Sequence, residues 1–151
     1  MSQIDEAIGS CLQSSTELEQ QYKLLVSVPG VGRVTAVTLL TETEGFRNVA
    51  SSRQLAAYAG IAPAPNQSGL MTRKSCISKV GNVRLRRSLY LAAVPATRTK
   101  TSLGVFYRRL REAGKPPKVA LVALARKILC ISFAVVRSKQ PFDVNYGQGL
   151  A

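Results

Sequence analysis

Histidine is absent from this 151-residue chain, and one long window also lacks aspartate and glutamate. The window covers residues 45–111, between Glu44 and Glu112, and it contains 13 lysines and arginines. Without histidine a Ser-His-Asp triad is excluded, and without carboxylates the window cannot hold a divalent metal ion. A surface with this excess of positive charge attracts polyanions, and nucleic acid is the commonest polyanion in a cell.

Cysteines, aromatic residues and strand-like patterns are also scarce. The three cysteines, Cys11, Cys76 and Cys130, are far apart and match no zinc-ligand spacing, and their odd number indicates a reducing, cytoplasmic setting. Aromatic residues make up 6% of the chain, which argues against a single-strand binder that stacks bases. No segment alternates cleanly between polar and apolar residues, so we predict a mainly α fold.

Charge divides the chain into two unequal parts. Residues 1–44 carry a net charge of −4 and residues 45–151 carry +17, which gives +13 in total. We expect a helical arm at residues 1–23, the main domain at 24–138 and a flexible tail at 139–151. The most apolar stretch, Val119 to Val136, contains Arg126 and Lys127, each of which costs about 2.5–3.5 kcal/mol at mid-bilayer. We therefore expect a core helix and no membrane association.

Helical patterns cover most of the chain. In the first helix, at residues 3–22, apolar residues recur every seven positions (Ile4, Cys11, Leu18, Leu25), which fits a coiled-coil seam between protomers or a helix lying on its own domain. A short apolar turn of helix at 24–28 follows, and then helices at 33–43, from Ser51 or Ser52 to 59, at 83–98, 103–113 and 118–138. Gly60 and Gly114 end two of them, and Pro95 is expected to kink the helix at 83–98 or to end it early. Prolines and glycines between residues 61 and 80 predict an ordered loop or short hairpin.

The segment Val28-Pro29-Gly30-Val31-Gly32 joins two helices in an apolar frame that resembles a helix–hairpin–helix motif. Gly30 and Gly32 would let backbone amides approach a phosphate, and the helix beginning at Arg33 offers its positive N-terminal end. The alternative is a tight turn between two helices.

A basic cluster surrounds the predicted loop and the start of the next helix. Charge runs are usually solvated faces, but the absence of nearby acids favours binding to nucleic acid. We expect these contacts from Asn82, which also caps the helix, and from the cations Arg73, Lys74, Lys79, Arg84, Arg86 and Arg87.

The dipeptide Ser68-Gly69 in the predicted loop is either a simple turn or the site of a nucleophile. A serine hydroxyl is a weak nucleophile that needs a base, a metal or electrostatic help to attack a phosphodiester. The surrounding cations of the basic cluster would stabilise the charge of a phosphoryl transition state.

The order and spacing of these motifs resemble the C-terminal transposase domain of the insertion-sequence 110/116/902 family. The resemblance covers about residues 24–138 and rests on residues 28–32, 52–63, 67–69 and 77–87, with further matches at 106–107, 114–115 and 118–127. It implies an RNA-guided DNA recombinase in which Ser68 is the nucleophile that joins covalently to DNA. It also implies a structured guide RNA, a homo-oligomer whose site is completed between protomers, and an N-terminal RuvC-like domain whose four acidic residues bind Mg²⁺.

The sequence departs from this family pattern in three places. No RuvC-like domain precedes the first helix, Pro95 stands where family helices continue, and the tail after Ser138 has no counterpart. We therefore expect a cytoplasmic, nucleoid-associated protein of a bacterium or archaeon that binds DNA and catalyses little without a RuvC-like partner. Two alternatives remain: a non-catalytic DNA- or RNA-binding remnant or regulator, and an adaptor acting through its N-terminal helix.

Overall fold

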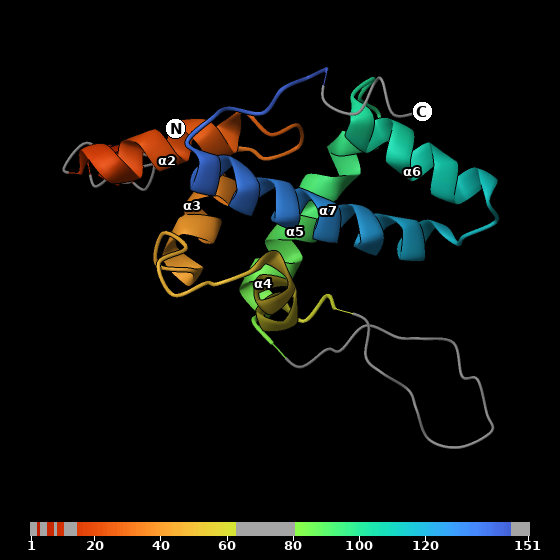
Figure 1. Ribbon diagram of the computed structural model, residues 1–151, viewed down its shortest axis with the longest axis horizontal. Coiled ribbons are helices and arrows are strands. Elements are labelled where there is room, and N and C mark those ends of the chain that lie inside the picture. Colours follow the sequence, from red (N-terminus) through yellow and green to blue (C-terminus); the bar gives the residue numbers. More distant parts are fainter. Residues whose placement is uncertain (1–2, 4–5, 8, 11–14, 63–80, 146–151) are drawn as a thin grey trace.

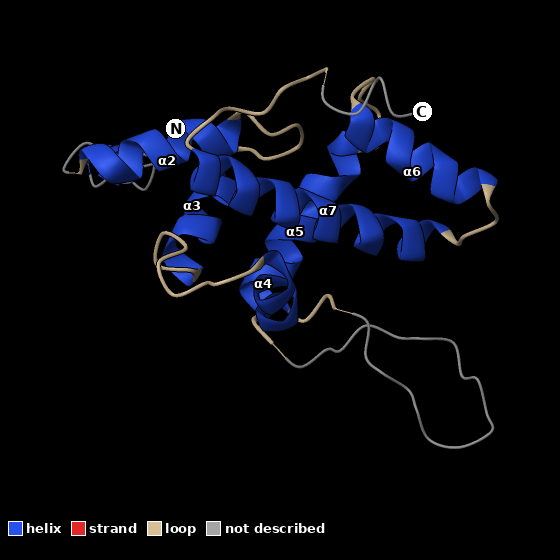
Figure 2. Ribbon diagram, viewed as in Figure 1, coloured by secondary structure: helices blue, strands red, loops and turns tan. Residues whose placement is uncertain are grey.

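The computed structural model shows a helical fold, drawn in Figures 1 and 2. It describes residues 3, 6–7, 9–10, 15–62 and 81–145. Over this part of the chain the labelled helices are α2 (Thr16–Val26), α3 (Arg33–Glu42), α4 (Ser52–Ala59), α5 (Val83–Ala96), α6 (Ser102–Glu112) and α7 (Pro117–Ser138), and no strand is present. The prediction of a mainly α fold is confirmed.

Helix α7 is the centre of the fold. Helices α2, α4, α5 and α6 all pack against it, and its buried side chains, which include Ala120, Leu124, Ile128 and Ser132, recur every four residues. By length and composition alone α7 is apolar enough to cross a membrane, but 44% of its most apolar window is buried inside the protein. Its contacts with four other helices give it the place of a core helix.

Helix α5 crosses α7 and links the two ends of the domain (Figure 1). Asn82 caps it as predicted, since the Asn82 Oδ1 atom accepts a hydrogen bond from the Leu85 N–H at 3.0 Å. The helix ends at Ala96, two residues before the predicted end. It continues through Pro95, since the Thr97 N–H still donates to the Ala93 carbonyl at 3.2 Å. We predicted a kink or an early end at Pro95; the helix includes Pro95 and ends one residue after it.

Helix α2 corrects one predicted boundary. The sequence suggests a helix ending at residue 22 and a separate apolar turn from residue 24, whereas α2 runs without interruption from Thr16 to Val26. No glycine or proline lies between these residues, and the exposed Lys23–Glu19 ion pair (2.8 Å) joins side chains one turn apart. The expected division between arm and domain after residue 23 thus falls inside one helix.

The N-terminal helix was expected either to form a coiled-coil seam between protomers or to lie on its own domain. Leu25, the last residue of the proposed seam, is fully buried in the core. Ile4 and Cys11 lie outside the described residues. At the other end of the chain, in the segment expected to be a flexible tail, the Phe142 N–H donates to the Ser27 Oγ atom at 2.9 Å, and the Phe142 ring packs against the core.

Candidate functional site

Asn82 joins three helices at one point, which we call the α5 junction (Glu42, Tyr58, Gly81 and Asn82). Its Nδ2 atom donates to the Glu42 Oε2 atom at 2.5 Å and to the Tyr58 hydroxyl at 3.2 Å. Its backbone N–H donates to the Tyr58 carbonyl at 2.8 Å. Together with its cap of α5, these bonds tie the C-terminal ends of α3 and α4 to the N-terminal end of α5.

Gly81 brings the chain into the junction at close range. Its φ of +148° is a backbone conformation that favours glycine, and a Cβ atom there would lie 2.6 Å from the Tyr58 carbonyl oxygen and 2.7 Å from the Gly60 nitrogen. Gly60 is itself the left-handed C-cap of α4, as predicted. Because Gly60 and Gly81 are adjacent in space, the two flanks of segment 63–80 leave and enter the fold at the same place.

Several predicted site residues belong to this segment. Ser68, Arg73, Lys74 and Lys79 all lie outside the described residues. Their roles therefore stay predictions, and the structure describes only the residues on either side of this segment.

The arginines that begin α5 give its N-terminal end an unusual charge. Arg84 and Arg87 are exposed, Arg86 is half-buried, and the first turn of α5 contains no acidic residue. Positive side chains at the positive end of a helix dipole each cost about 0.3–1 kcal/mol when exposed. A bound anion would relieve this repulsion, so the end of α5 is suited to a phosphate.

One carboxylate reaches this basic end despite the acid-free window in the sequence. Glu42 Oε1 lies 3.8 Å from the Arg84 Nη1 atom, and the Glu42 side chain is 22% exposed. The expectation that no carboxylate lies near the basic cluster is therefore wrong. The sequence window 45–111 contains no acid, but the fold brings Glu42 beside Arg84. Sequence spacing gave no signal for Glu42, because 40 residues separate it from Asn82.

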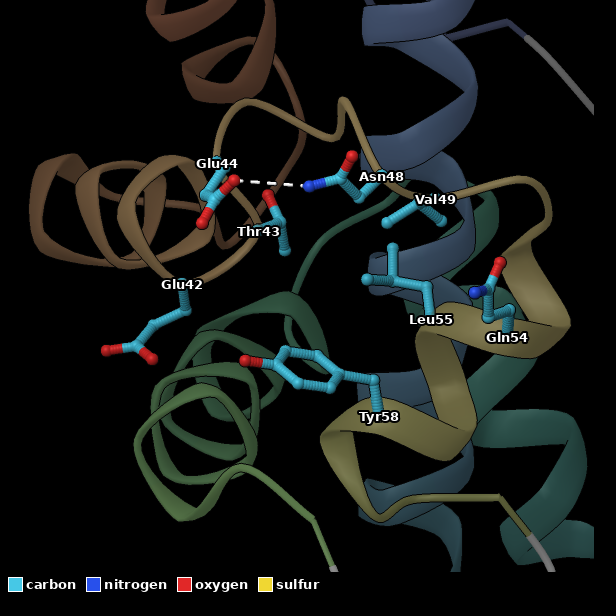
Figure 3. Close-up of a pocket in the computed structure, with 8 residues that line it drawn as sticks. All are labelled: Glu42, Thr43, Glu44, Asn48, Val49, Gln54, Leu55 and Tyr58. Atoms are coloured by element: carbon cyan, nitrogen blue, oxygen red, sulfur yellow. Dashed lines mark hydrogen bonds between the residues drawn. The ribbon is translucent and has the colours of Figure 1, made fainter.

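A pocket of about 230 Å³ opens beside the junction (Figure 3). The end of α3, the loop that follows and helix α4 supply its lining, which consists of Glu42, Thr43, Glu44, Asn48, Val49, Gln54, Leu55 and Tyr58. The Asn48 Nδ2 atom donates to Glu44 Oε2 at 3.2 Å. Two carboxylates do not make a metal centre, and within the described part of the chain no three His, Cys, Asp or Glu side chains gather at a metal-binding distance.

The two glycines of the expected phosphate-binding motif, in the turn before α3, have different surroundings. Gly30 has φ +86°, and a Cβ atom there would lie 2.3 Å from the Ala92 carbonyl oxygen of α5. Its conformation therefore serves the packing of α3 and α5. Gly32 has open space around it and precedes the N-terminal end of α3, which begins at Arg33 and has no side-chain cap. A phosphate contact at Gly32 and Arg33 stays a prediction.

The expected binding residues do not form one compact group. Gly30 meets α5 at Ala92, which is eight residues from Arg84 and therefore about 12 Å farther along the helix axis. The turn and the arginines are thus two separate positions on α5. The described residues bring together only Asn82, Arg84 and their partners Glu42 and Tyr58.

The described residues form an α-helical domain with a basic start of α5. Comparison with known families places it further: the model described as the Transposase IS116/IS110/IS902 family matches residues 22–108. This match covers more than half of the chain, and the chain therefore belongs to that family. The matched residues include Ser68 and the whole of α5.

Curated relatives agree with this assignment. The chain is 34% identical to a pilin gene-inverting protein of Moraxella bovis, over 95% of this chain and 45% of the relative. It is 33% identical to an insertion element IS110 protein of Streptomyces coelicolor, over 95% of this chain and 36% of the relative. It is 30% identical to a transposase for insertion sequence element IS1111A of Coxiella burnetii, over 91% and 40%. The chain thus spans less than half the length of these relatives.

Proposed function

We propose that this chain is the nucleic-acid-binding part of a DNA transposase and that it carries the nucleophile for strand exchange. The observation that carries the proposal is the family match over residues 22–108, since it contains both the Ser68-Gly69 motif and the basic start of α5. Relatives named as a transposase and as a gene-inverting protein support DNA as the substrate. A cytoplasmic location follows from that substrate.

Ser68 is the proposed nucleophile. Its Oγ atom attacks the phosphorus of a DNA phosphodiester, a new Oγ–P bond forms, and the bond from phosphorus to one deoxyribose oxygen breaks. The proton of the serine ends on the released sugar hydroxyl, so the step needs no oxidant or reductant. A second sugar hydroxyl then displaces Ser68 by the reverse chemistry and joins the exchanged strands.

The role of the α5 junction in this proposal is to position the segment that contains Ser68. The close approach of Gly60 and Gly81 holds both flanks of residues 63–80, and Asn82 fixes the end of α5 beside them. Arg84 and Arg87 then offer positive charge to the phosphates next to the reacting one. The charge of these two arginines favours a phosphate at the N-terminal end of α5 over one at the turn before α3.

A Mg²⁺ ion does not fit the described residues of this chain, because only two carboxylates, Glu42 and Glu44, share the pocket. We assign the metal to a RuvC-like acidic domain outside this chain. A structured guide RNA and a homo-oligomer that completes the site belong to the same proposal.

A covalent adduct provides the test. The chain is combined with an acidic RuvC-like domain of the family, Mg²⁺, guide RNA and radiolabelled DNA, and adducts are separated on a denaturing gel. We expect an adduct with the native chain and with Ser78→Ala, the matched control in the same segment, and none with Ser68→Ala. Full adduct formation by Ser68→Ala would refute the assignment. DNA binding without any adduct from the native chain would instead identify a non-catalytic remnant or regulator.

A further inference from the structure

The helices α6 and α7 form an antiparallel hairpin that carries much of the positive charge of the protein (Figure 1). Residues 98–127 contain nine lysines and arginines and a single acid, Glu112. We call this set the hairpin surface; its cations are Arg98, Lys100, Arg108, Arg109, Arg111, Lys115, Lys118, Arg126 and Lys127. None of them belongs to the basic cluster at the start of α5.

The hairpin cations have no carboxylate partners among the described residues. The ion pairs found in that part of the chain join Lys23 to Glu19, Arg47 to Glu17 and Arg84 to Glu42, all outside the hairpin. Nine cations against one acid, Glu112, therefore leave the surface with a large excess of positive charge for an external anion.

Two of the arginines are held in place by backbone carbonyl groups. Arg108 Nη1 donates to the carbonyl oxygens of Thr97 (3.4 Å) and Thr99 (3.3 Å), near the end of α5. Arg111 Nη1 donates to the carbonyl oxygen of Lys115 (2.6 Å), beyond the end of α6. Both guanidinium groups remain exposed, so they are ordered without being neutralised.

Two cations also lie close together where α6 and α7 pack against each other. The half-buried Lys127 places its Nζ atom 4.2 Å from the centre of the Phe106 ring. Partial burial and the nearby Arg109 guanidinium lower the pKa of Lys127. The Lys127 ammonium and the Arg109 guanidinium thus repel each other between α6 and α7, and a bound anion would reduce the repulsion.

We propose that the hairpin surface is a second DNA-binding surface, which holds the sugar–phosphate backbone of duplex DNA. This inference rests on the proposed function, since the family acts on DNA. The only aromatic side chains of α6, Phe106 and Tyr107, are half-buried and pack against the core, so base stacking has no platform there. Contacts of this kind position a duplex and do not read its sequence.

The hairpin surface and the α5 junction lie at opposite ends of α5. The helix has 14 residues, so its ends are about 20 Å apart, and α6 begins beyond the C-terminal end. One surface therefore cannot substitute for the other at the same phosphate. The junction presents the reacting segment, and the hairpin surface holds the duplex elsewhere.

Equilibrium binding of the 151-residue chain to a 20-base-pair DNA duplex tests the inference. Fluorescence anisotropy is measured from 50 to 300 mM KCl for the native chain and for two triple variants. The hairpin variant is Arg109→Gln/Lys115→Gln/Lys118→Gln. The matched control is Lys23→Gln/Arg53→Gln/Lys139→Gln, which removes the same charge from exposed residues outside both surfaces. Circular dichroism checks that both variants are folded.

We expect the hairpin variant to bind at least about tenfold more weakly at 150 mM KCl, with a log–log salt slope that is less negative by about 2–3, because three phosphate contacts are lost. The control should change affinity less than about threefold. Equal losses in the two variants, no loss in the hairpin variant, or a loss seen only with a 20-base-pair RNA duplex would each overturn the inference. The readout needs no reaction at Ser68, so it fails independently of the adduct assay.

Discussion

The α5 junction and the hairpin surface use positive charge in different ways. At the junction, Arg84 faces Glu42, and the Asn82 side chain forms hydrogen bonds with Glu42, Tyr58 and the first turn of α5. On the hairpin no cation meets a carboxylate within the described residues, and the hydrogen bonds of its arginines go to backbone carbonyls. The first arrangement fixes geometry, whereas the second supplies charge. The proposed function needs both, since the segment that contains Ser68 must be aligned and the duplex must be held.

The largest expected effect comes from a glycine of the junction. Gly81→Ala places a Cβ atom 2.6 Å from the Tyr58 carbonyl oxygen at a φ of +148°, whereas Gly114→Ala, between α6 and α7, meets no atom within 4 Å. We expect Gly81→Ala to lower the free energy of unfolding by about 2–4 kcal/mol and Gly114→Ala by about 1–2 kcal/mol. Urea denaturation measures both. Equal losses would show that the junction is no tighter than the hairpin turn.

Two substitutions of Asn82 separate the contribution of the α5 cap from that of the hydrogen bonds to α3 and α4. Asn82→Ser keeps a side-chain cap for α5 but removes the donor to Glu42 and Tyr58, while Asn82→Ala removes both. We expect losses of about 1 kcal/mol for serine and about 2 kcal/mol for alanine in the free energy of unfolding. Thermal unfolding followed by circular dichroism gives the comparison. A serine variant as stable as the native chain would mean that the bonds to α3 and α4 contribute nothing.

Removing single acids compares the two surfaces in binding. Glu42→Gln takes a negative charge from beside Arg84, and Glu112→Gln takes the single acid from the hairpin surface. Because each change reduces repulsion of phosphate, we expect DNA affinity to rise about two- to threefold in both cases at low salt. Anisotropy titrations at 50 mM KCl provide the measurement. A rise with Glu112→Gln alone would confine DNA binding to the hairpin surface.

The smallest effect concerns the charge of Lys127. Burial and Arg109 lower its pKa in the folded protein, so below pH 10.5 the unfolded chain binds this proton more tightly than the folded one. Its contribution therefore destabilises the fold at neutral pH, and stability should rise as the pH passes the folded pKa toward 10.5. NMR titration should give Lys127 a pKa below the ordinary lysine value of 10.5, and DNA binding should raise it. An unshifted Lys127 pKa would contradict the crowding of positive charge between α6 and α7.

The parts of the fold that sequence predicted are those decided by neighbouring residues. The Ser51 Oγ atom accepts from the Gln54 N–H, Asn82 caps α5, and Gly60 ends α4 in a left-handed conformation. Each of these signals spans four residues or fewer, so the sequence displays it directly. The early end of α5 near Pro95 belongs to the same group.

The parts that escaped prediction depend on contacts between distant segments. The hydrogen bond between Asn82 and Glu42 joins residues 40 positions apart, and the residues around either one do not predict it. Gly30 looked like a phosphate-binding glycine, and only its approach to Ala92 revealed a packing role. The hairpin cations were visible in the composition, but no motif surrounds them, and only the packing of α6 against α7 brings together the two helices that carry most of them.

Mapping the protein–DNA linkage by mass spectrometry tests most directly whether this chain brings a nucleophile to DNA. The complete recombination mixture, containing the acidic domain, Mg²⁺ and guide RNA, is trapped during strand exchange and digested with a protease and a nuclease. We expect one modified peptide, with a nucleotide attached through phosphorus to the Oγ atom of Ser68. Strand exchange without this peptide, or a nucleotide attached to any other residue, would contradict the proposed role of the chain.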